Sequence, residues 1–269
     1  VTEITFKNLS MIDPLEYFAF PHLIAMIIEN FGIDLNTINY SKLKLLNICE
    51  FFYNKQFQKH GKFFVIKSMN FDQIHTYFAL VDHFESDEDI FGLDHDEEDW
   101  NRDELNRCGL LCRENLTFFI QIMPQFLIAK FIATHLMKPK KRFDHTKFIK
   151  FFFKMSTSQM YKEVLLFVDG LMIHEELNSV NNYFCEFLPQ NESLSKLLVK
   201  PFSEGHFNVC HFLIKSINQH MKLNHENIFN PLRINFEDCF TLACAKVNND
   251  NQDIFDKIKK IINFPSSSS

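Results

Sequence analysis

Apolar residues recur at helical spacing in a series of short windows along the chain, and polar residues, Pro or Asn bound each window. The clearest window has five apolar residues at the i, i+1, i+4, i+7, i+8 spacing of one helix face: Ile254, Phe255, Ile258, Ile261 and Ile262. Lysines and aspartates fill the positions between them. This pattern predicts an amphipathic helix near the end of the chain.

Similar windows predict further helices, and most of these windows come in pairs: 22–31, 42–53, 71–84, 126–137, 161–168 and 209–217. The presumed pairs repeat at intervals of roughly 35 to 54 residues. Antiparallel helix pairs of this length cannot bury their apolar faces alone, so stacking against neighbouring pairs is the natural solution. We therefore expect an all-α chain that forms an α-solenoid of irregular antiparallel helix pairs. A compact all-α bundle has the same pattern and stays open as the alternative.

Composition supports the helical prediction. The chain of 269 residues has 33 Phe but only 6 Gly and 8 Pro. A β-sandwich needs frequent turns, and a dinucleotide-binding fold needs glycines after its first strand, so both classes fit poorly. The Phe excess accompanies many Asn, Ile and Lys residues, and we interpret it mainly as codon bias.

The net charge and the number of cysteines limit the cellular location and the kinds of partner that we expect. The net charge of −6 gives no general attraction to nucleic acid or to anionic lipid. Seven Cys is an odd number, and the sequence begins without the features of a secretion signal, so we expect reduced thiols in the cytoplasm. The most apolar window, 118–137, is interrupted by polar residues and by Pro124, which argues against a membrane span. We expect neither a nucleic-acid nor a membrane partner.

The segment Glu85–Glu104 holds eleven acidic residues and one basic residue, Arg102. We interpret it as a solvated acidic loop that repels wrong partners or docks a basic partner protein. The residues that we expect to bind the partner lie at its centre: Asp94, Asp96, Glu97, Glu98, Asp99 and Trp100.

Two other interpretations concern charged segments. Asp87, Asp89, Gly92 and Glu98 match positions 1, 3, 6 and 12 of an EF-hand loop, but Phe91 occupies position 5, where an oxygen ligand is needed. We therefore expect no calcium site. The basic run that starts at Lys138 is interleaved with Phe residues, and we interpret it as a turn before a buried helix rather than a nucleic-acid site.

The segment Gly205–Ile214 reads Gly-His-Phe-Asn-Val-Cys-His-Phe-Leu-Ile. It resembles the ankyrin repeat, in which a Gly-His pair turns the chain between two helices and an apolar pattern packs the second helix. Asn208 stands where the family usually has Glu. A looser similarity begins at Thr241, and the Thr-Pro-Leu-His signature is absent before Gly205. The resemblance implies protein binding through a concave helical surface, without a cofactor.

A second class of function stays open as the alternative. His206, Cys210 and His211 lie close together on one predicted helix, and such ligands could hold zinc or form the site of a helical enzyme. The chain has no Gly-x-Ser-x-Gly, no phosphate-binding Gly-rich loop and no His-Glu-x-x-His. Packing of the helix is the interpretation that we favour for these three residues. We expect no catalytic residues, no metal and no cofactor.

The predicted organisation is N-terminal helical hairpins over 1–84, the acidic loop over 85–104, ankyrin-like helical repeats over 105–264 and a tail over 265–269. The stretch Ile38–Phe52 resembles the helix pair near the end of BTB domains, which leaves a docking adaptor as a further possibility. The sequence predicts a non-catalytic scaffold or adaptor for protein–protein interaction, and it leaves the oligomeric state open.

Overall fold

The computed structural model describes a defined part of the chain: residues 45–61, 65–66, 69–83, 122–137, 161–172, 192–221 and 240–262, with single positions at 103, 105, 110–111, 117–118, 120, 148, 151–152 and 154–155. Helix accounts for 83% of this part. Its strands are β1 (Val65–Ile66) and β2 (Met69–Asn70), which pair antiparallel, and Leu111 forms an isolated bridge with Phe118. The prediction of a mainly helical chain is confirmed here.

The helices have the following bounds: α3 Leu45–His60, α4 Phe71–His83, α6 Met123–Met137, α8 Lys162–Leu171, α10 Glu192–Glu204, α11 Phe207–Met221 and α13 Gln252–Ile262. Residues 240–244 form a further short helical segment. Every helix predicted between residues 42 and 262 has a counterpart here, whereas the window 22–31 lies outside the described residues. Among the described helices, none has both the length and the apolar character that a bilayer span requires.

Two features differ from the expected pattern. The α10 helix is absent from the predicted windows, and it contains Pro201 in its last turn. A proline there removes one backbone hydrogen bond, which makes a helix harder to recognise from sequence. The β1–β2 hairpin was not expected either, because two residues per strand are too few for an alternating pattern.

Contacts within the chain divide it into two compact units. Residues 1–87 and 93–128 form unit 1, and residues 88–92 and 129–269 form unit 2, so the division falls inside α6. In unit 1, Phe71 is fully buried at the first position of α4. The ring of Tyr53, on α3, lies 5.6 Å from that of Phe71 and 5.9 Å from that of Phe126. Aromatic packing therefore joins α3, α4 and the start of α6.

A polar contact accompanies this aromatic core. The Tyr53 hydroxyl donates a hydrogen bond to the Asp72 carboxylate. Burial, reinforced by the charge of Asp72, raises the pKa of Tyr53 far above its usual range, so this hydroxyl stays protonated. Asn70 and Gln73 exchange backbone-to-side-chain hydrogen bonds of 3.0 Å in both directions. This reciprocal capping box fixes the start of α4.

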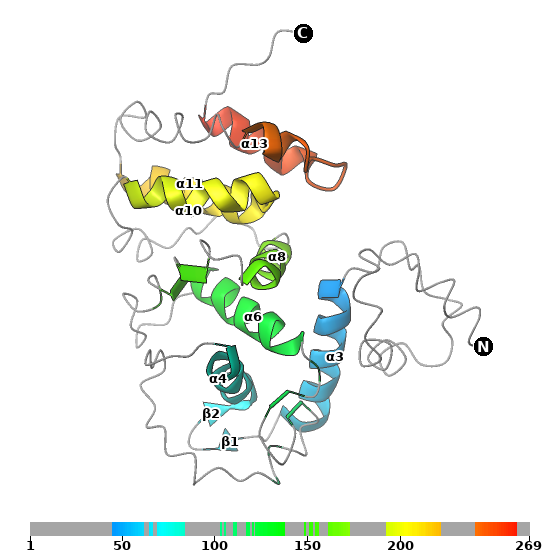
Figure 1. The fold of residues 1–269 in the computed structure, drawn as a ribbon. Helices are drawn as coiled ribbons and strands as arrows, with labels where there is room; N and C mark the ends of the chain where they lie inside the picture. Colours follow the sequence, from blue (N-terminus) through cyan, green and yellow to red (C-terminus); the bar gives the residue numbers. More distant parts are fainter. Residues whose placement is uncertain are drawn as a thin grey trace, which may run out of the picture. The chain divides into compact units, whose positions relative to one another are not determined.

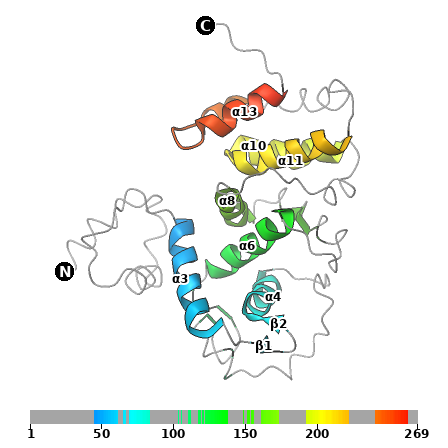
Figure 2. The same ribbon diagram turned by 180° about the vertical axis from the view of Figure 1, so that it is seen from behind.

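In unit 2, α11 contacts α8, α10 and α13. Figures 1 and 2 show α10 and α11 between α8 and α13 in both views. Four phenylalanines from four helical segments form the core between α10 and α13: Phe202, Phe207, Phe240 and Phe255. The amphipathic pattern of α13 is explained by this contact, because Phe255 and Ile258 are buried while Asp253 and Lys257 face water.

The start of α13 has its own capping box. Asn248 Oδ1 accepts the Asn251 N–H at 3.2 Å, and Asn251 Oδ1 accepts the Asn248 N–H at 2.8 Å. We expect Asn248→Ala to lower the free energy of unfolding by about 1 kcal/mol, the usual cost of losing a capping side chain. Urea denaturation followed by circular dichroism measures this. Asn249→Ala is the control, because Asn249 is exposed and its side chain makes no hydrogen bond in the described part of the chain; equal effects of both variants would refute the capping role.

Candidate functional site

The turn between α10 and α11 is built on Gly205, which has a φ of 88°. The Gly205 N–H donates to the Phe202 carbonyl at 3.1 Å, and the His206 N–H donates to the Pro201 carbonyl at 2.8 Å. These two bonds form a Schellman motif, in which a left-handed residue satisfies the last carbonyls of a helix. The expected Gly-His turn between two helices is therefore present at this position.

Gly205 also lies against the next hairpin of unit 2. A Cβ atom added at Gly205 would lie 2.8 Å from Cβ of Lys246, closer than real Cβ atoms approach one another. Lys246 follows the helical segment 240–244, and its N–H donates to the Ala243 carbonyl at 2.9 Å. The absence of a side chain at Gly205 thus allows the backbones of two successive turns to come together.

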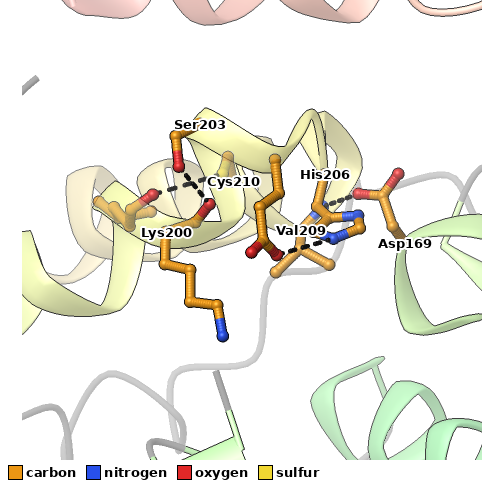
Figure 3. Close-up of polar contacts among 8 residues, drawn as sticks. Asp169, Lys200, Ser203, His206, Val209 and Cys210 are labelled. Carbon is orange, nitrogen blue, oxygen red and sulfur yellow. Dashed lines mark hydrogen bonds and ion pairs between the residues drawn. The ribbon is translucent and has the colours of Figure 1, made fainter. Parts of the chain in front are cut away.

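The first turn of α11 is held by Asp169, near the end of α8. One carboxylate oxygen accepts the Val209 N–H at 3.0 Å (Figure 3). The other accepts the Asn208 Nδ2–H at 3.1 Å. Asp169 is half-buried. Burial raises the pKa of Asp169 to about 6, although these two hydrogen bonds and one from the Asn208 backbone N–H act in the opposite direction. A carboxylate from one helix therefore caps another helix.

His206 precedes α11 and is buried. Its Nε2 lies 3.5 Å from Oε2 of Glu204, and neither atom makes a hydrogen bond within the described residues. Burial lowers the pKa of His206 to about 4, and the charges of Lys162 and Lys200 act in the same direction. His206 is therefore neutral at pH 7, and its contact with Glu204 is a polar contact rather than an ion pair between two full charges.

Cys210 and His211 point to different neighbours. The Cys210 thiol is fully buried, and its Sγ lies 4.0 Å from the Leu198 carbonyl oxygen of α10, to which it donates (Figure 3). His211 is also buried, and burial lowers its pKa to about 4. The charges that act on it include Lys257 and Asp253 of α13, so it lies on the α13 side of α11.

The sequence placed His206, Cys210 and His211 in a candidate zinc or enzyme site. In the described ranges, no three His, Cys, Asp or Glu residues gather in an arrangement that could hold a metal ion. The three side chains instead contact Glu204, Leu198 and the α13 side of the unit. As a group they form packing contacts of α11, and this arrangement offers no activated nucleophile next to a base.

The predicted partner-binding residues lie outside the described residues: Asp94, Asp96, Glu97, Glu98, Asp99 and Trp100. The same holds for the EF-hand-like positions and for most of the basic run after Lys138. Asp169 was not among the predicted site residues, because its hydrogen-bond partners lie 39 and 40 positions further along the chain. The only local signal is an acidic residue just before Gly170 near the end of a helix, which is too common to be decisive.

Comparison with known proteins gives no match: no family model, no curated protein and no solved structure is significantly similar to this chain.

Proposed function

We propose that this chain is a non-catalytic scaffold or adaptor that binds a partner protein through the surface of stacked helix pairs, as a divergent ankyrin-like α-solenoid. The observation that carries the proposal is the contact of α11 with α8 on one side and α13 on the other. Two successive hairpins, α10–α11 and 240–244 with α13, are joined by one Phe core. Serial packing of hairpins is the arrangement by which repeat proteins expose a long binding surface.

The alternative of a Cys/His enzyme receives little support from the same residues. A nucleophilic Cys needs a thiolate and an accessible position, whereas the Cys210 thiol is buried and donates to a backbone carbonyl. The neutral His206 points to Glu204 rather than to this thiol. These contacts of Cys210 and His206 favour a role in packing the helices together over a role in catalysis.

Thiol labelling separates the two functions. We expect Cys244, which is exposed, to react with a maleimide in the native protein, while Cys49 and Cys210 react only after unfolding. Burial raises the pKa of the Cys49 thiol far above its usual value, which lowers its reactivity further. Peptide mapping by mass spectrometry, with Cys244 as the internal control, measures the three rates. Native labelling of Cys210 as fast as that of Cys244 would favour the enzyme.

For the partner surface, we propose the acidic segment 85–104, whose charge suits a protein with a basic patch. The test is a quantitative pull-down with three versions of the full chain. The first is unaltered, the second has Asp96, Glu97 and Glu98 changed to Asn or Gln, and the third has Asp250, Asp253 and Asp256 changed to Asn. The third version is matched in charge and alters exposed or half-exposed acids at the start of α13.

We expect at least a tenfold loss of the same captured protein with the second version and little change with the third. Retention of that protein by the second version would remove the acidic segment from the proposal. Equal losses with both versions would show that binding depends only on net charge. The interaction would then be nonspecific.

A further inference from the structure

We draw no further inference here: the strongest candidate, the side-chain pair of His206 and Glu204 at the turn between α10 and α11, places Nε2 and Oε2 3.5 Å apart, but in the part of the chain that the structure describes no third His, Cys, Asp or Glu joins them to hold a metal ion, and nothing there shows what else the pair would bind.

Discussion

Replacing Phe202 with Ala is expected to lower the free energy of unfolding of unit 2 by about 4 kcal/mol, the typical cost of truncating a buried Phe. Phe202 has no exposed surface. Its ring lies 5.7 Å from that of Phe207, 6.4 Å from that of Phe240 and 5.9 Å from that of Phe255. The substitution would leave a cavity where α10, α11, the segment 240–244 and α13 meet.

Urea denaturation followed by circular dichroism measures this loss. The matched control is Leu242→Ala, because Leu242 lies in the same unit and is 59% exposed. We expect that control to change stability by less than about 0.5 kcal/mol. A loss of under about 1 kcal/mol in Phe202→Ala would contradict the shared core, since it would mean that the four rings do not depend on one another.

The second large effect is expected at Gly205. Gly205→Ala should cost about 3 kcal/mol for two separate reasons. Its φ of 88° is unfavourable for a residue with a Cβ, which costs roughly 1–2 kcal/mol. In addition, the new Cβ would lie 2.8 Å from Cβ of Lys246, and overpacking of this kind costs roughly 1–3 kcal/mol.

A double-mutant cycle separates the two reasons. Lys246→Gly removes the Cβ that the new methyl group would meet, so Gly205→Ala should cost at least about 1 kcal/mol less in that background. The backbone part of the cost should remain. If the cost of Gly205→Ala is the same with Lys246 and with Gly at position 246, the two turns do not approach each other as described.

The sequence predicts those parts of the fold that depend on local spacing. The α13 helix follows from the period of Ile254, Phe255 and Ile258, and the turn at Gly205 follows from a residue that tolerates a positive φ. The α10 helix escaped prediction because Pro201 interrupts its backbone hydrogen bonds while the packing of Phe202 compensates for the loss. Tertiary contacts stabilise α10, and a short window of sequence does not reveal them.

The candidate site shows the same contrast between what local sequence spacing predicts and what only the fold determines. The proximity of His206, Cys210 and His211 in sequence suggested a common ligand set, but their side chains leave the helix toward different neighbours. Residues at i, i+4 and i+5 on a helix share a region without sharing a direction. Asp169, in contrast, comes to α11 from a different helix, and only the fold brings it to Val209. Sequence spacing carries no information on such a pair.

The central claim is that helix pairs pack in series in unit 2, and distances between α8, α11 and α13 test it most directly. Spin labels would be attached in pairs at Leu166, Lys215 and Lys257 through an unnatural amino acid, since the chain has seven Cys. Pulsed electron paramagnetic resonance then measures the three separations. With neighbouring helix axes about 10 Å apart, serial packing predicts an α8–α13 separation about twice that of either neighbouring pair. Three similar separations would indicate a closed bundle and contradict the account.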